Sequence, residues 1–167
     1  KITPDEPATL TLLTESMIRR AGKTGADDDW AQAVTAAEQL NHARDDLDSE
    51  NLLGRAYFGS HQFDQAAVPL EKIAKAKPGD GQAWLLYGIS LSRSGQSRKA
   101  MEALEITIQI IPDSIPALKE LGYVYESDKQ YQQALRIYEK AYAAGNSSDA
   151  SIKESIDRVR ALAAQQD

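Results

Sequence analysis

Cysteine is absent from this chain of 167 residues, and basic clusters and long apolar runs are missing as well. Without Cys the chain has no disulfide, no thiolate metal site and no thiol nucleophile. No run of Lys and Arg is longer than the pair Arg19-Arg20, and the formal net charge is −6, which disfavours nucleic acid as a partner. No segment approaches the roughly 18 apolar residues of a membrane-spanning helix. These absences favour a non-membrane protein without thiol chemistry.

The composition that remains is that of a folded protein. Hydrophobic residues make up 42% and charged residues 26% of the chain, close to globular averages and unlike a disordered chain. The length fits one ordinary domain. The first residue is Lys1 rather than Met. This suits equally an exported protein after signal-peptide removal, expected in the periplasm or envelope, and a trimmed chain, expected in the cytoplasm.

A repeat with a period of 34 residues runs through the middle of the chain, and such periods indicate solenoids. When the units are aligned, their glycines share one column and their alanines share a second. Two units end at a Pro, and the third has Asn146 at that position. The columns are Gly54, Gly88 and Gly122; Ala66, Ala100 and Ala134; and Pro78, Pro112 and Asn146.

Each unit reads as two amphipathic helices joined by a tight turn. In the middle unit, apolar residues from Trp84 to Leu91 follow helical spacing until Ser94-Gly95-Gln96 interrupts it. A second amphipathic helix follows and is expected to stop near Pro112. The small residues of the Gly and Ala columns let the two helices approach closely, and large residues fill the space toward the next hairpin.

These columns resemble the tetratricopeptide repeat (TPR) family, whose pattern includes a Leu-Gly pair, a Tyr, an Ala and a Pro at set spacings. The resemblance covers residues 47–148 and includes Leu121-Gly122, Tyr125, Ala134 and Tyr138 in the third unit. It implies an all-α fold, a right-handed α-solenoid of stacked helical hairpins. Three divisions are expected: an N-terminal helical pair (a degenerate repeat) in 1–46, three repeats in 47–148, and a C-terminal capping helix and tail in 149–167.

The two ends carry helical patterns of their own. Upstream, the sequence predicts two helices separated by a long acidic loop from Gly22 to Asp29, with apolar faces formed by Leu10, Leu13, Met17, Ile18 and Ala21, and by Trp30, Ala33, Ala37 and Leu40. Downstream, Ile152, Ile156, Val159 and Leu162 form an apolar stripe. A stripe of this kind is expected of a helix that covers the last face of a solenoid.

No catalytic, cofactor or metal site is expected from the sequence. Gly22-Lys23-Thr24 lacks the upstream Gly and strand of a phosphate-binding loop. The acidic runs Asp27-Asp28-Asp29 and Asp45-Asp46 do not fit a calcium loop, and helix N-termini explain them better. His42 and His61 are the two histidines, and neither has a second His at ligand spacing. We therefore expect a protein that is not an enzyme, with no cofactor and no metal.

The resemblance places a peptide-binding groove on the first helices of the repeats. Some of these positions carry apolar side chains that lie outside the stripe of core residues. A row of exposed apolar side chains suggests a surface that binds a partner. The same hydrophobic residues could instead pack against neighbouring helices. The expected groove consists of Asn51, Arg55, Phe58, Leu85, Ile89, Arg93, Lys119, Tyr123 and Glu126.

The sequence thus predicts an adaptor or scaffold that binds a protein or peptide partner, an amphipathic helix or an extended segment. A bacterial multiprotein assembly, such as an envelope, secretion or pilus-related machine, is the expected setting. The basic cluster by which some TPR proteins bind chaperone tails is not assembled, because Leu86, Pro116 and Glu120 stand at its positions. The alternative is a self-associating scaffold, for which the mass of a homo-oligomer would depend on concentration.

Overall fold

The computed structural model describes residues 7–145 and 147–165, and within them the secondary structure is entirely helical. Asn146, the last residue of the Pro column, lies outside the described residues, as does the end of the C-terminal tail. The helices are α1 (Pro7–Thr24), α2 (Asp27–Arg44), α3 (Leu47–Gly59), α4 (Phe63–Ala76), α5 (Gly81–Arg93), α6 (Ser97–Ile110), α7 (Ile115–Ser127), α8 (Tyr131–Ala144) and α9 (Ala150–Ala163).

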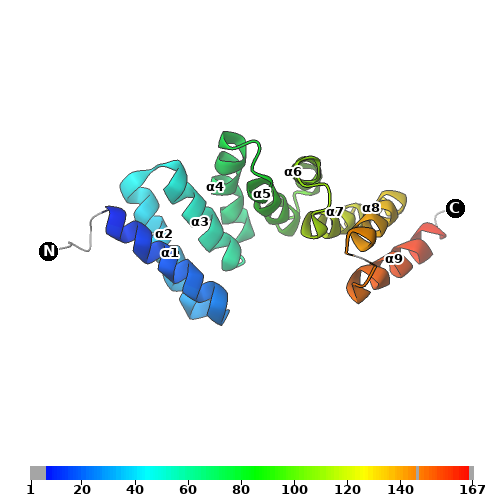
Figure 1. Ribbon diagram of the computed structural model, residues 1–167, viewed down its shortest axis with the longest axis horizontal. Coiled ribbons are helices and arrows are strands. Elements are labelled where there is room, and N and C mark those ends of the chain that lie inside the picture. The colour runs from blue at the N-terminus through cyan, green and yellow to red at the C-terminus, as the bar shows by residue number, and fades with distance from the viewer. Residues whose placement is uncertain (1–6, 146, 166–167) are drawn as a thin grey trace. The chain divides into compact units, whose positions relative to one another are not determined.

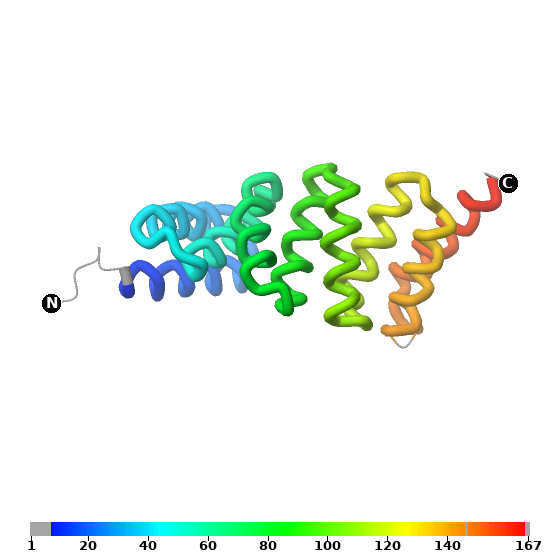
Figure 2. Tube along the Cα trace, turned by 90° about the horizontal axis from the view of Figure 1, so that it is seen from above, coloured from blue at the N-terminus to red at the C-terminus, as the bar shows by residue number. Residues whose placement is uncertain are grey.

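The chain divides into two compact units, residues 1–77 and 78–167. In the first unit, α1 packs with α2 and α3 with α4, and α3 also contacts both helices of the first pair. In the second unit, α5 packs with α6 and α7 with α8, while α9 lies against α8 (Figures 1 and 2). Each unit is therefore a stack of helical hairpins, and the all-α repeat fold expected from the sequence is confirmed.

The glycine column brings the two helices of each repeat into close contact. A methyl group at Gly54 would lie 2.9 Å from the side chain of Leu70, and one at Gly88 would lie 2.8 Å from Cγ of Leu104. At Gly122 it would meet the ring of Tyr138 at 2.7 Å. Real side-chain carbons do not approach this closely, so the column is fixed by contact across each hairpin.

Tyrosine hydroxyls join successive hairpins within each unit. Tyr57 on α3 donates to Oε1 of Glu38 on α2 at 2.7 Å, and Tyr125 on α7 donates to Oε1 of Glu105 on α6 at 2.8 Å. Burial and these hydrogen bonds raise the pKa of both tyrosines to about 12. Leu91 occupies the same column in the middle repeat and has no hydroxyl to donate. The first and third repeats therefore share this hydrogen bond, and the middle repeat cannot make it from the same position.

The N-terminal pair differs from the prediction in two places. The expected loop from Gly22 to Asp29 is wrong, because α1 continues to Thr24, α2 begins at Asp27, and Gly25 makes the turn at a φ of 65°. Buried Asp29 accepts from Thr24 Oγ1 at 2.6 Å and pairs with Arg20 at 2.8 Å, which holds this short turn.

Leu13 is the second difference, because it was expected on the buried face of α1 and is 43% exposed. Thr14 is buried in its place and donates to the carbonyl oxygen of Leu10 at 2.8 Å, which satisfies its hydroxyl within the helix. The buried core of this pair includes Ile18, Ala21, Ala33 and Leu40.

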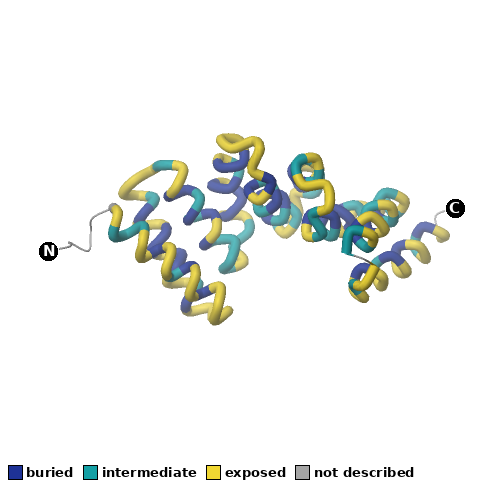
Figure 3. The backbone as a smooth tube through the Cα atoms, in the orientation of Figure 1, coloured by how far each residue is buried: buried dark blue, intermediate teal, exposed yellow. Residues whose placement is uncertain are grey.

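The last helix covers the final hairpin, as expected of a cap. Ile152, Ile156 and Val159 of α9 are buried in a cluster with Leu118 and Tyr138. The opposite side of α9 is exposed, and Figure 3 shows buried and exposed segments alternating along this helix. Asp149 caps its N-terminus by accepting from the backbone N–H groups of Ser151 and Ile152.

Candidate functional site

The predicted groove residues divide between the two units. Asn51, Arg55 and Phe58 lie on α3 in the first unit, and the other six lie on α5 and α7 in the second. Phe58 is half-buried and meets the edge of Phe63, with ring centroids 5.7 Å apart. Asn51 is half-buried and Arg55 is exposed. The candidate site lies within the second unit, on α5 and α7.

The central part of the candidate site is an aromatic ring with a cation on its face. Tyr123 of α7 is 45% exposed, and the guanidinium carbon of Arg93, on α5, lies 5.4 Å from the centre of its ring. Ile89, one helical turn before Arg93, is half-buried on the same side of α5. We call these three residues, Ile89, Arg93 and Tyr123, the α5–α7 surface.

A buried carboxylate fixes the cation of this surface. Glu120 on α7 is 8% exposed, and its Oε2 accepts from Nη2 of Arg93 at 2.9 Å. Its Oε1 accepts from the hydroxyl of Ser92 at 2.5 Å. A buried carboxylate requires such partners to offset the loss of its water. Arg93 is thus held between Glu120 and the ring of Tyr123, and its remaining N–H groups are available to an acceptor.

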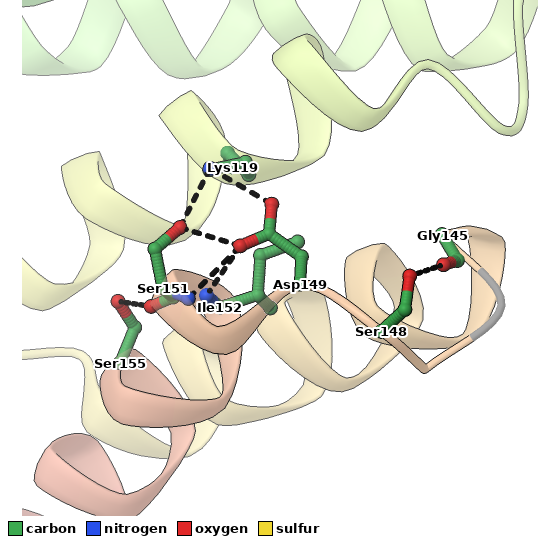
Figure 4. Close-up of polar contacts among 7 residues, drawn as sticks. All are labelled: Lys119, Gly145, Ser148, Asp149, Ser151, Ile152 and Ser155. Carbon is green, nitrogen blue, oxygen red and sulfur yellow. Dashed lines mark hydrogen bonds and ion pairs between the residues drawn. The ribbon is translucent and has the colours of Figure 1, made fainter.

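Three other predicted residues have structural roles. Leu85 is buried and therefore does not offer a contact surface. Lys119 donates to Asp149 at 3.2 Å and to the hydroxyl of Ser151 at 2.9 Å, at the start of α9 (Figure 4). The hydrogen bond from Ser151 and the contact with Lys119 are among the causes that lower the pKa of Asp149 to about 2.

Glu126 is the third of these residues, and it joins α7 to α9 within the second unit. Its two carboxylate oxygens accept from Nε and Nη2 of Arg158 at 2.7 and 2.9 Å, in a bidentate pair. The hydroxyl of Tyr138 donates to it as well, at 3.1 Å. The hydrogen bond with Arg158 is the main cause that lowers the pKa of Glu126, with a smaller opposing effect of burial.

Replacing Glu126 by Gln is expected to reduce stability by about 1 kcal/mol at neutral pH, since Arg158 is half exposed and the surrounding water weakens the pair. A lowered carboxyl pKa gives stability that is fully present above the unfolded pKa, about 4.3, and is lost as the pH falls through the folded value. The difference between wild type and Glu126→Gln should therefore be constant near neutrality and shrink in acid.

Urea unfolding over a pH series measures this difference, and Glu154→Gln is the control because Glu154 is exposed on α9. An undiminished difference at acid pH would contradict the assignment of the pair to Glu126 and Arg158.

Sequence reasoning identified Arg93 and Tyr123 but not the residue that fixes them. Glu120 shares its repeat column with Leu52 and Leu86. A carboxylate in an otherwise apolar column is a signal that it will be buried and paired. The residues at and near α9 that bind Lys119 and Glu126 could not be recognised in this way, because they lie outside the repeated columns of the sequence.

The structure offers no cluster of three His, Asp or Glu side chains that could hold a metal ion among the residues it describes. His61 lies in the exposed turn between α3 and α4 at a φ of 60°, and His42 is exposed in the last turn of α2. Lys23 and Thr24 end α1 instead of forming a phosphate-binding loop. None of the helices described is sufficiently long and apolar to cross a membrane.

Comparison with known proteins identifies the fold through solved structures. No protein-family model matches the chain, and no curated protein does. A crystal structure of the MamA protein superposes with a TM-score of 0.80 at 19% identity, covering 94% of this chain and 84% of that one. MamA from Desulfovibrio magneticus RS-1, from residue 41 to its end, gives a TM-score of 0.75 at 21% identity, covering 87% and 79%.

A third similar structure, MamA AMB-1, gives a TM-score of 0.72 at 20% identity over 89% of this chain and 78% of that one. At these identities the likeness concerns the fold alone. It agrees with the helical-repeat solenoid deduced from the Gly and Ala columns.

Proposed function

We propose that this chain is a non-catalytic adaptor of the TPR family that binds a segment of another protein on the α5–α7 surface. The observation that supports this most is the pairing of exposed Tyr123 with Arg93, held in place by buried Glu120. A rigid aromatic ring and an oriented guanidinium lose little conformational entropy on binding, and such residues often dominate the energy of an interface.

The chemistry of the α5–α7 surface favours one kind of ligand segment. An apolar side chain would lie on Tyr123 and Ile89, and a carboxylate or backbone carbonyl would accept from Arg93. Because Lys119 and Glu126 are engaged by α9, Arg93 is the charged group of the predicted groove in this unit that an incoming acceptor would meet. An extended or helical segment with apolar and acidic residues fits this surface.

A bacterial multiprotein assembly remains the proposed setting, at the envelope or in a secretion or pilus-related machine. The similarity of fold to a protein of Desulfovibrio magneticus supports a bacterial origin. The compartment is a separate question with two alternatives. The protein is either periplasmic or envelope-associated, or it is cytoplasmic. Fractionation of native cells with an antibody against the chain distinguishes these compartments.

The binding surface is tested by photo-cross-linking in native cells, followed by measurement with the purified partner. A cross-linking amino acid at position 123 should capture a partner that the same residue at exposed Val68 does not capture. In calorimetry with that partner, Ile89→Ala/Tyr123→Ala should weaken binding by about tenfold or more, as expected for central interface residues.

Val68→Ala serves as the matched control, because Val68 is an exposed apolar residue on α4. Binding of the partner by Phe58→Ala tests separately whether α3 contributes to the binding surface. Equal binding by wild type and the double variant would contradict the proposed surface.

A further inference from the structure

Glu120 carries a charge at a position where packing does not require one. In the 34-residue register it shares a column with Leu52 and Leu86, so an apolar side chain occupies this position in the other two repeats. Glu120 is nevertheless buried. Burying a carboxylate costs free energy that only good partners offset, and departures from a local packing rule tend to occur at functional sites. A role other than packing is therefore expected of Glu120.

The partner of Glu120 distinguishes it from the other buried carboxylates. Asp29 and Glu50, which are also buried in the part of the chain that the structure describes, each pair with a cation of their own hairpin. Glu120 of α7 instead pairs with Arg93 of α5, in the preceding hairpin. Arg93 is also the cation that lies on the ring of Tyr123. The ion pair thus belongs to the α5–α7 surface.

The negative charge of Glu120 lies directly beside the cation that a ligand would meet. Oε2 of Glu120 is 2.9 Å from Nη2 of Arg93, and the hydroxyl of Ser92 donates to Oε1 at 2.5 Å. The side chain of Arg93 is 47% exposed, and a guanidinium has five N–H groups in all. An acceptor on a ligand can therefore bind Arg93 without displacing Glu120.

The guanidinium of Arg93 consequently offers hydrogen bonds with little net charge. Its formal charge of +1 is balanced by the −1 of Glu120. A ligand carboxylate on Arg93 would be attracted by the guanidinium and repelled by Glu120, because the two carboxylates would bind neighbouring N–H groups of one side chain. A neutral carbonyl oxygen would accept the same hydrogen bond without this repulsion.

The other two charged groove residues of the second unit are balanced as well. Lys119 is paired with Asp149, and Glu126 is paired with Arg158. These pairs leave no unmatched cation among the predicted groove residues of α5 and α7. The charge that a ligand carboxylate meets on this surface is therefore decided by the pair of Arg93 with Glu120.

We propose that Glu120 sets the acceptor preference of the α5–α7 surface, by lowering its affinity for a carboxylate until carboxylates and neutral carbonyls bind Arg93 with similar strength. This inference rests on the proposed function, because it concerns the same surface. Specificity is a difference of two affinities, and a repulsive group can set it as well as an attractive one. A partner with an acidic residue is still accepted, but its apolar contact with Tyr123 and Ile89 supplies most of the affinity.

Two small probes separate the charge of a ligand from its apolar contact. N-acetyl-leucine has an apolar side chain and a carboxylate, and N-acetyl-leucinamide has the same side chain and a neutral amide. Nuclear magnetic resonance titration at low salt gives both dissociation constants, from the Nε–H signal of Arg93 and the ring signals of Tyr123. Wild type should bind the two probes with dissociation constants within about threefold of each other.

Glu120→Gln removes the negative charge and keeps the size of the side chain. This variant should bind N-acetyl-leucine at least about tenfold more tightly than N-acetyl-leucinamide, because the carboxylate then meets a cation without a neighbouring negative charge. Added salt should reduce that preference, since it screens charges at a surface. Arg93→Gln/Glu120→Gln, which removes both charges and leaves no buried charge unpaired, should show no preference.

Glu102→Gln is the matched control, because Glu102 is exposed on α6 and its replacement changes the net charge equally. It should keep the wild-type ratio of the two dissociation constants. Circular dichroism and urea unfolding verify the fold of each variant. A purely structural role of Glu120 would change the affinity for both probes alike, so the ratio distinguishes that role from the proposed one.

An unchanged ratio in Glu120→Gln would overturn the inference, and so would a lack of binding of N-acetyl-leucine to that variant. A wild type that already prefers N-acetyl-leucine by about tenfold would overturn it as well. The proposed function fails separately, if Ile89→Ala/Tyr123→Ala binds the cross-linked partner as wild type does. Loss of the partner in that double variant, together with an unchanged probe ratio in Glu120→Gln, would keep the surface and remove the role of Glu120.

Discussion

Gly122→Val is expected to lower the free energy of unfolding of the second unit by about 3 kcal/mol. A Cβ at this position would lie 2.7 Å from two ring carbons of Tyr138, and the larger side chain would extend farther into that ring. Tyr138 is buried and its hydroxyl donates to Glu126, so the ring has little freedom to move away. Overpacking a close contact costs about 1–3 kcal/mol and occasionally more.

The expected loss of stability is informative, because replacing Gly within a helix ordinarily raises stability. Helix propensity alone would give up to about 1 kcal/mol of added stability. Gly22→Val is the matched control, since Gly22 lies within α1 and a Cβ there meets nothing within 4 Å. We expect this control to be neutral or slightly stabilising.

Tryptophan fluorescence can follow each unit separately during denaturation. Trp30 lies in the first unit and Trp84 in the second. In a Trp30→Phe background, the urea midpoint reported by Trp84 should fall in Gly122→Val and stay in place in Gly22→Val. An unchanged midpoint in Gly122→Val would show that the glycine column does not set the approach of α7 and α8.

The sequence allowed the repeated architecture to be predicted because its determinants recur at a fixed period. Gly54, Gly88 and Gly122 each oppose a large side chain of the partner helix, and the alanines of the second column are fully buried. A contact required in every hairpin leaves the same residue type in every unit, so it is visible without a structure.

The N-terminal pair was predicted less well because a tertiary interaction overrides local signals. The segment from Gly22 to Asp29 is rich in Gly and Asp, which suggests a loop. In the structure Asp29 is buried against Thr24 and Arg20, and one left-handed Gly25 makes the whole turn. The burial of Asp29 depends on contacts with α1, and the composition of the local segment does not reveal those contacts.

The candidate site was predictable only in part, for a related reason. The positions of Arg93 and Tyr123 follow from the repeat register, but their contact does not. The partners of Lys119 and Glu126 come from α9, about one repeat further along the chain, and they involve side chains that no column repeats. Ion pairs of this kind form between one particular pair of helices, so their residues do not recur at the 34-residue period of the sequence.

Ile152→Ala in α9 is expected to destabilise the second unit by about 2–5 kcal/mol. Ile152 is fully buried against the last hairpin, in a cluster with Leu118 and Tyr138. Truncating it removes apolar contact and leaves a cavity, and both effects lower stability. The loss should extend beyond α9, because in a stack of repeats each element is stabilised by its neighbour.

Lys153→Ala is the control for this variant, since Lys153 is the next residue of α9 and its side chain is exposed. Urea unfolding followed by Trp84 fluorescence and by circular dichroism should give a lower midpoint for Ile152→Ala by both probes and wild-type values for Lys153→Ala. If the helical signal falls early while Trp84 keeps its wild-type midpoint, α9 unfolds alone and does not stabilise the hairpins before it. A shared shift instead makes α9 the cap on which the second unit, and with it the contact of Arg93 with Tyr123, depends.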